Sequence, residues 1–223
     1  EVGAARFAVC YRPRSRPGGD FYDVKRLDED HVSFFLADVM GRGSGAGSLL
    51  GTFARQSIVA KEITAARYTL VPPDEVLARL NRELIGLGLE DPPFVAMLYG
   101  MLNVHTGYLA FARAGLPAPV FIPAVGDLET WSSPGPFLGV FDAAYPVRRG
   151  RLTPGDKLIL GTDGTRPEGD SAAVPVSDPL RSAAETHRGL TGQVFVDAVS
   201  HDLLAHISQP DDFTLLAVEF RNS

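Results

Sequence analysis

Two stretches of this chain, FLADVMGRGSG at residues 35–45 and DKLILGTDG at residues 156–164, follow the same pattern. In each, a run of apolar residues ends in one aspartate and the chain then turns through glycines. The runs predict buried β-strands that the glycines terminate. A glycine-rich turn between a strand and a helix usually attracts phosphate through its backbone N–H groups, whereas a carboxylate at its entrance repels an anion. The pattern therefore predicts two buried strands that each end in an aspartate.

The remaining elements predict a layered fold. Aromatic and β-branched residues predict strands, many of them paired as hairpins, at 5–11, 21–27, 31–39, 94–103, 108–114, 119–124, 128–133, 156–164 and 211–220. Helical spacing of apolar residues predicts helices at about 44–68, 74–87, 179–188 and 192–207. This order predicts an α/β (α+β) fold of two mostly antiparallel sheets flanked by helices, a four-layer αββα sandwich. We expect residues 1–223 to form one domain.

Composition limits the classes of partner. The formal net charge is −6, so the broad positive field that drives binding to nucleic acid or anionic membranes is missing. Cys10 is the only cysteine, which excludes an internal disulfide and favours a cytoplasmic location. No apolar run is long enough to span a bilayer, so membrane insertion is not expected. The sequence starts without methionine, and we expect a domain taken from a longer protein.

Four aspartates share one context at predicted strand edges: Asp20 in GGDFYD, Asp38 in LADVMGRG, Asp163 in GTDGT and Asp211 in QPDDFT. A single aspartate at such a place often only shapes a turn. Several carboxylates at one end of a sheet raise one another's pKa unless cations compensate their charge. Oxygen ligands without histidine or cysteine suit Mg²⁺ or Mn²⁺. Two such ions roughly 3.5 to 4 Å apart activate a water for attack on phosphorus, which predicts a metal-dependent phosphatase.

A family resemblance agrees with this prediction. The blocks that carry it are PGGDFYDV, LADVMGRG, PPDEVLARLNREL, FVAMLYGMLNVHTGYLAFARAGLPAPV, PGDKLILGTDG and DDFTLLAV. In this order they resemble the PPM metal-dependent serine/threonine phosphatases, in the bacterial stage II sporulation protein E branch (SpoIIE/RsbU-like). This branch includes the phosphatases that switch on stress sigma factors. The resemblance covers nearly the whole chain.

The resemblance implies a binuclear site with two Mn²⁺ or Mg²⁺ ions. By the family pattern Asp38 bridges both ions and Val39 offers its backbone carbonyl to one of them. Asp163 and Asp211 hold the other ion. Asp20 completes the acidic ring, directly or through a water. Asp38 and Asp163 are accordingly the expected catalytic residues.

The chain departs from the family pattern near the expected substrate pocket. Relatives often have histidine in place of Arg42, and often AGH where residues 114–116 read AGL. They also tend to have an acid soon after the TDG turn, where this chain has Thr165–Arg166–Pro167 before Glu168. These departures remove no expected metal ligand.

Two arginines and one further acid complete the expected site. Arg42 or Arg16 could bind the phosphate in a bidentate contact, although a solvated loop arginine is an equally good interpretation of either. We expect Asp212, the second acid of its pair, to point away from the metals and cap its strand.

The resemblance also suggests partners. The implied substrate is a phosphorylated protein, for example an anti-sigma factor antagonist. An upstream sensor domain in the parent chain would regulate the phosphatase through the helices predicted at 44–68 and 74–87.

Other functions fit the sequence less well. Gly41, Gly43 and Ala46 match a dinucleotide-binding GxGxxA turn, but a second helix follows where a parallel strand is needed. The GTDGT segment resembles an aspartyl-phosphate loop, yet Gly161 stands where the nucleophile belongs. The alternative that stays open is an inactive pseudophosphatase of the same fold that binds a partner.

Overall fold

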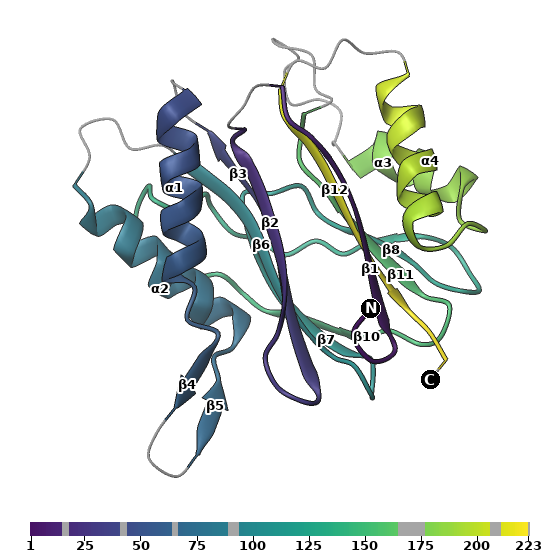
Figure 1. The fold of residues 1–223 in the computed structure, drawn as a ribbon, viewed down its shortest axis with the longest axis horizontal. Coiled ribbons are helices and arrows are strands. Elements are labelled where there is room, and N and C mark those ends of the chain that lie inside the picture. The colour runs from purple at the N-terminus through teal and green to yellow at the C-terminus, as the bar shows by residue number, and fades with distance from the viewer. Residues whose placement is uncertain are drawn as a thin grey trace.

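The computed structural model describes residues 1–14, 18–40, 44–63, 67–88, 94–164, 177–205 and 211–222. Two five-stranded sheets stack face to face at its centre (Figure 1). In spatial order, one sheet consists of β1 (Ala5–Arg12), β12 (Phe213–Phe220), β11 (Lys157–Gly161), β8 (Val120–Ile122) and β9 (Glu129–Thr130). The other consists of β10 (Arg148–Arg151), β7 (Tyr108–Ala114), β6 (Phe94–Asn103), β3 (His31–Met40) and β2 (Asp20–Arg26).

Helices cover the outer face of each sheet. Helices α1 (Ser44–Ser57) and α2 (Pro73–Gly86) contact the sheet that contains β3, β6 and β7. Helices α3 (Ser177–Thr186) and α4 (Gly192–Leu204) contact the sheet that contains β1, β8 and β12. The strand pairings within both sheets are antiparallel. The predicted four-layer sandwich is therefore confirmed (Figure 1).

The main core lies between the two sheets. Phe34 and Leu36 of β3 point into it, while Phe35 between them packs toward the helices, as the alternation of a strand requires. Trp131 stacks on Phe121 with their ring centroids 4.4 Å apart. Strand β12 is buried along its whole length, because one of its faces lies against β3 and its neighbours and the other against α4.

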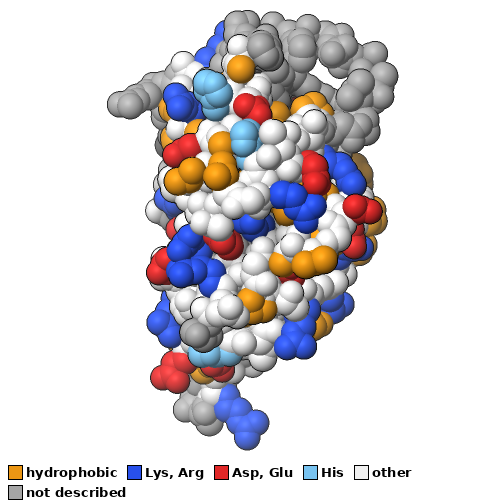
Figure 2. Space-filling model, turned by 90° about the vertical axis from the view of Figure 1, so that its right-hand side faces the viewer, with side chains coloured by type: hydrophobic (Ala, Val, Ile, Leu, Met, Phe, Trp, Pro, Cys, Tyr) orange, Lys and Arg blue, Asp and Glu red, His pale blue; other side chains and the backbone are white. Residues whose placement is uncertain are grey.

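The surface is mixed in character. Figure 2 shows the face that includes α3 and α4, where apolar side chains lie singly among charged ones. Such scattered exposure is normal for a folded domain. In the described part of the chain, no helix is both long and apolar enough to cross a bilayer.

The helix predicted at 44–68 is wrong in its second half. Helix α1 ends at Ser57, and a hairpin of β4 (Lys61–Ile63) and β5 (Tyr68–Leu70) follows it. The Lys61 ammonium lies 3.8 Å from the centre of the Tyr68 ring and donates to the Leu27 carbonyl at 3.2 Å. Tertiary contacts of this kind override the helical spacing of isolated apolar residues.

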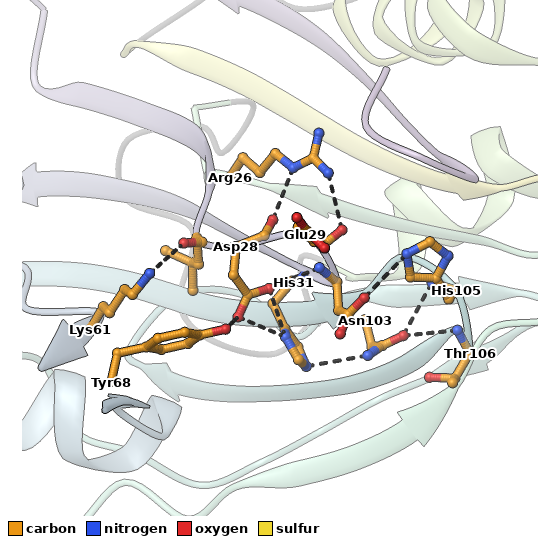
Figure 3. Close-up of polar contacts among 11 residues, drawn as sticks. Arg26, Asp28, Glu29, His31, Lys61, Tyr68, Asn103, His105 and Thr106 are labelled. Atoms are coloured by element: carbon orange, nitrogen blue, oxygen red, sulfur yellow. Dashed lines mark hydrogen bonds and ion pairs between the residues drawn. The ribbon is translucent and has the colours of Figure 1, made fainter. Parts of the chain in front are cut away.

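Hydrogen bonds connect the β4–β5 hairpin to the sheet that contains β3, at the end where β3 begins (Figure 3). The Tyr68 hydroxyl donates to Asp28 Oδ2 at 3.0 Å, and Asp28 Oδ1 accepts the backbone N–H of His31 at 2.7 Å. The Asn103 side chain lies 3.3 Å from His31 Nε2 and joins the β6–β7 turn to the same network. This network is about seven strand residues from Asp38, or roughly 24 Å.

Strand β10 was not predicted. Its sequence, RRGR, lacks the apolar alternation that marks a strand. It forms nonetheless, at the edge of its sheet, because the register of Arg148 to Arg151 against β7 satisfies its backbone. Charged residues are common on edge strands, where they oppose aggregation.

We expect Gly100→Ala to destabilise the fold by about 1 to 3 kcal/mol, the usual effect of overpacking a core. A Cβ at Gly100 would lie 2.4 Å from Cζ of the fully buried Phe34. Urea denaturation of both proteins measures the difference. Gly86→Ala is the matched control, since its Cβ meets no described atom within 4 Å and the helix should gain up to about 1 kcal/mol. Equal stabilities of the two variants would contradict the prediction.

Candidate metal centre

Two acids face each other at one end of the sandwich. Asp20, the first residue of β2, is the registered partner of Asp38 on β3. Asp38 has the same parity as Phe34 and Leu36, which lie in the inter-sheet core, so it faces the space between the sheets. Asp20 and Asp38 thus lie side by side at one end of this sheet.

Asp20 connects the two sheets. It is 5% exposed, and its Oδ2 accepts the hydroxyls of Thr162 at 2.8 Å and Thr214 at 2.6 Å. Burial raises the pKa of Asp20 to about 7, although the two threonine hydrogen bonds lower it. Thr162 directly precedes Asp163, so this contact also brings Asp163 to the same end of the sandwich.

Asp212 does not point away, contrary to expectation. It is 6% exposed, and its carboxylate accepts the backbone N–H groups of Arg14 at 2.6 Å, Gly19, and Asp20 at 3.3 Å. Its own backbone N–H donates to Asp211 Oδ1 at 2.8 Å. Asp212 therefore fixes the segment that leads into Asp20, while Asp211 beside it is exposed.

Glycines make this packing possible. A Cβ at Gly18 would lie 2.6 Å from Asp212 Oδ2, and one at Gly164 only 1.8 Å from the Asp212 carbonyl oxygen. No side chain fits at Gly164 beside this backbone atom, and a side chain at Gly18 would displace the Asp212 carboxylate. The glycines of GGD and TDG thus allow Asp212 to sit between the two loops.

A third glycine leaves space in front of two expected donors. The Val39 N–H donates to the Gly19 carbonyl at 3.2 Å. A Cβ at Gly19 would lie 3.0 Å from the Val39 carbonyl oxygen and 3.6 Å from Asp38 Oδ1. Without it, both oxygens border the same small space, as a shared cation would require.

The charges of the other acids reach Asp38. Burial is the largest cause that raises the pKa of Asp38, to about 8, and the carboxylates of Asp20, Asp163, Asp211 and Asp212 raise it further, in that order. The four acids predicted from the sequence are therefore close enough to interact. Their oxygen donors suit Mg²⁺ or Mn²⁺.

The carboxylates do not surround one point closely. Within the described ranges, no three histidine, cysteine, aspartate or glutamate side chains are grouped as the ligands of one ion. The donor type, the mutual charge and the space at Gly19 fit divalent cations, whereas the side-chain positions do not form a closed coordination shell. Arg16 and Arg42, the predicted phosphate contacts, lie outside the described residues.

Sequence reasoning missed the residues that support the acids. Thr162 and Thr214 hold Asp20, and Asp212 holds the loop before it. A signal was present, because Thr162 adjoins Asp163 in GTDG and Thr214 follows Asp212 by two residues, on the same strand face. Hydroxyl side chains next to a candidate ligand are natural supports for its carboxylate.

Comparison with known families identifies the class of protein. The family model of stage II sporulation protein E (SpoIIE) matches residues 28–221. The chain belongs to this family, as the sequence blocks predicted. Protein IcfG of Synechocystis sp. PCC 6803 is 24% identical over 239 residues, which is 96% of this chain and 37% of IcfG.

Solved structures share the fold. The RsbU and RsbW domains of Rv1364c from Mycobacterium tuberculosis superpose with a TM-score of 0.76 and 25% identity, over 99% of this chain and 61% of that one. The SiaA-PP2C domain of Pseudomonas aeruginosa gives a TM-score of 0.75 with 21% identity, over 97% and 85% of the two chains. This chain thus spans only part of IcfG and of the Rv1364c chain.

One more distant structure was solved with metals. The catalytic domain of the serine/threonine protein phosphatase PstP, in complex with 2 manganese ions, has a TM-score of 0.59 and 12% identity, over 98% of this chain and 99% of that one. At this identity the likeness extends to the fold alone.

Asp212→Ala should destabilise the metal-free protein by about 2 to 4 kcal/mol. The substitution removes the carboxylate that accepts hydrogen bonds from the backbone N–H groups of Arg14, Gly19 and Asp20. These N–H groups would then lose their acceptor. Chemical denaturation in the presence of a chelator measures the loss. Asp211→Asn, which keeps an oxygen for the Asp212 N–H, should cost far less; similar losses in both variants would show that the buried carboxylate is not the anchor.

Asp38→Asn should stabilise the metal-free protein at neutral and alkaline pH. The pKa of Asp38 is raised to about 8, so between about pH 4 and pH 8 the folded state holds a proton that the unfolded state has lost. Stability contributed by this group therefore falls as pH rises through that window. We expect the variant to melt about 2 to 6 °C higher at pH 8, with the difference vanishing near pH 4.

Scanning calorimetry in a chelator at both pH values measures this difference. Asp127→Asn, which removes an exposed acid from the β8–β9 turn, is the control for the change in net charge. A melting temperature for Asp38→Asn at or below that of the unmodified protein at pH 8 would refute the prediction.

Proposed function

We propose that this chain is a metal-dependent protein serine/threonine phosphatase. The observation that carries the proposal is the pairing of Asp20 with Asp38 at one end of a sheet, where Thr162 and Thr214 of the other sheet hold Asp20. The pKa of Asp38, raised by burial and then by the carboxylates of Asp20, Asp163, Asp211 and Asp212, agrees with it. A fold that gathers acids at this cost to its own stability is explained most simply by divalent cations as their partners. Membership of the SpoIIE family and the PP2C-type fold support the same reaction class.

The donors would divide into two kinds. Asp38, the Val39 carbonyl, Asp163 and Asp211 would hold two Mn²⁺ or Mg²⁺ ions. Asp20, with one oxygen already fixed by the two threonines, would complete the ring through its other oxygen or a water. Bound ions of this kind supply a water nucleophile at neutral pH and neutralise charge on the phosphoryl group.

The remaining residues position these donors. Asp212 fixes the backbone of Gly19 and Asp20, and Val39 N–H is held by the Gly19 carbonyl. Such outer contacts orient ligands and tune their affinity for metal. Arg42 and Arg16 are proposed to bind the phosphate of the substrate in bidentate contacts.

The proposed substrate is a phosphoserine or phosphothreonine of a signalling protein, such as an anti-sigma factor antagonist. Support comes from the family and from the Rv1364c structure, which contains RsbU and RsbW domains. An upstream sensor domain is part of the same proposal, since this chain spans 37% of IcfG. A cytoplasmic setting is also proposed, because Cys10 is the only cysteine. No contact with nucleic acid or insertion into a membrane is proposed.

Manganese-dependent hydrolysis of p-nitrophenyl phosphate and of a phosphoserine peptide tests the proposal. Asp38→Asn and Asp163→Asn should each lower kcat by at least about 100-fold, the scale of removing one electrostatic group from an active site. Asp127→Asn should retain full activity. Equal activity of Asp38→Asn and the unmodified protein would refute the assignment.

A pseudophosphatase is the second candidate, and one observation favours it. Among the described side chains, the acids are not closed around a single point. Calorimetric titration with Mn²⁺ separates the two functions when it accompanies the activity assay. Binding of manganese without turnover of any phosphopeptide would establish the binding module in place of the enzyme.

A further inference from the structure

An apolar pair of rings lies beside the candidate metal centre. Phe94 begins β6 and is 44% exposed, although it is a large aromatic residue. Its ring centroid is 6.3 Å from that of Phe137, with the ring planes tilted by 32°. Met40, the registered partner of Phe94 on β3, is also only partly buried. We call Met40, Phe94 and Phe137 the apolar ledge.

The ledge shares a strand face with Asp38. Asp38 pairs with Ala96, and Met40 pairs with Phe94. Met40 is therefore two positions from Asp38, and Phe94 is two positions from the partner of Asp38. Ala96 belongs to the inter-sheet core, and Phe94 has the same parity. Asp38 and Phe94 are diagonal neighbours, a relation that places side chains roughly 7 to 8 Å apart. The ledge thus borders the space into which Asp38 points.

The position of Phe137 is fixed by a glycine. Gly115 has a φ of +69°, and a Cβ there would lie 2.3 Å from Cδ1 of Phe137. The Gly115 N–H donates to the Gly135 carbonyl at 3.0 Å, and Leu138 exchanges two backbone hydrogen bonds with Val95. Both sides of Phe137 are therefore anchored, and its ring is held against Phe94 before any ligand arrives.

Three of the most exposed apolar side chains lack this context. Val125 is 90% exposed in the β8–β9 turn and Val194 is 63% exposed on α4, where scattered apolar side chains are unremarkable (Figure 2). Ile63 is 81% exposed on the β4–β5 hairpin, beyond the end of α1 that is distant from Asp38 (Figure 1). None of these three residues has the partner ring and the continuity with Asp38 that the ledge residues combine.

We propose that the apolar ledge sets substrate preference by binding an aliphatic or aromatic side chain of the phosphoprotein close to its phosphoserine. An extended chain advances about 3.3 to 3.6 Å per residue. The separation of roughly 7 to 8 Å from Asp38 thus corresponds to about two residues from the phosphorylated position. This inference rests on the proposed function, because it places the phosphate at Asp38.

Two phosphoserine peptides of equal length test the inference. They differ only at the second residue before and the second residue after the phosphoserine. One peptide carries leucine at both of these positions, and the other carries serine. The ratio of their kcat/KM values should favour the leucine peptide by about 10-fold or more, the discrimination an apolar contact provides. Phe94→Ser should bring this ratio to within about 3-fold of one, and Phe137→Leu should lower it partly.

Tyr108→Ala is the matched control. Tyr108 is a 50% exposed aromatic residue at the opposite end of the same sheet, about nine β6 residues or roughly 30 Å from Phe94. It should leave the ratio unchanged. Melting temperatures of the three variants confirm that each is folded. A ratio near one in the unmodified protein, or a ratio that survives Phe94→Ser, would overturn the proposal.

Binding to Asp38→Asn separates this inference from the proposed reaction. Fluorescence anisotropy of the two labelled peptides gives a ratio of Kd values that needs no turnover. One outcome is that no peptide is hydrolysed, while the leucine peptide binds at least about 10-fold more tightly and Phe94→Ser abolishes the difference. That outcome would refute the proposed phosphatase activity and support the role of the apolar ledge in substrate preference. If both peptides bind equally, the ledge is refuted whether or not hydrolysis occurs.

Discussion

The hydrogen bonds from Thr162 and Thr214 to one oxygen of Asp20 are the contacts on which the site depends. They join an acid of one sheet to hydroxyls of the other, at 2.8 and 2.6 Å. A buried carboxylate is costly unless its oxygens are satisfied, and here the satisfaction comes from across the sandwich. The relative position of the two sheets and the position of the acids are therefore set by the same contact. Asp163 and Asp212 flank these threonines and are located with them.

The acids at this end oppose the stability of the fold that carries them. Burial and mutual repulsion raise the pKa of Asp38 and Asp20, so the charged form of each carboxylate is destabilised in the folded protein. The rest of the molecule compensates with an apolar core between the sheets and a polar network at the far end of β3. Functional sites are often strained in this way, with stability supplied elsewhere in the domain.

The four layers of the fold and the aspartates of the candidate site could be predicted from the sequence, because short local sequence patterns indicate both. Strands with alternating burial, such as β3, and helices with one apolar face, such as α2, need little tertiary context to be recognised. The hairpin after Ser57 could not be predicted, since it depends on contacts of Lys61 and Tyr68 with the β2–β3 turn. The role of Asp212 was hidden for a similar reason: its partners are backbone groups almost two hundred residues away in the chain.

The single tryptophan has an optical consequence. Trp131 lies in the inter-sheet core, stacked on Phe121, and its indole N–H donates to Glu129 at 2.9 Å. All indole emission from this chain thus originates between the sheets, at a place shielded from water. A red shift of that emission would report water entering between the sheets at the edge formed by β9 and β10. Rearrangements confined to the outer helices would leave the emission spectrum unchanged. Tryptophan fluorescence therefore distinguishes separation of the two sheets at this edge from movement of the outer helices.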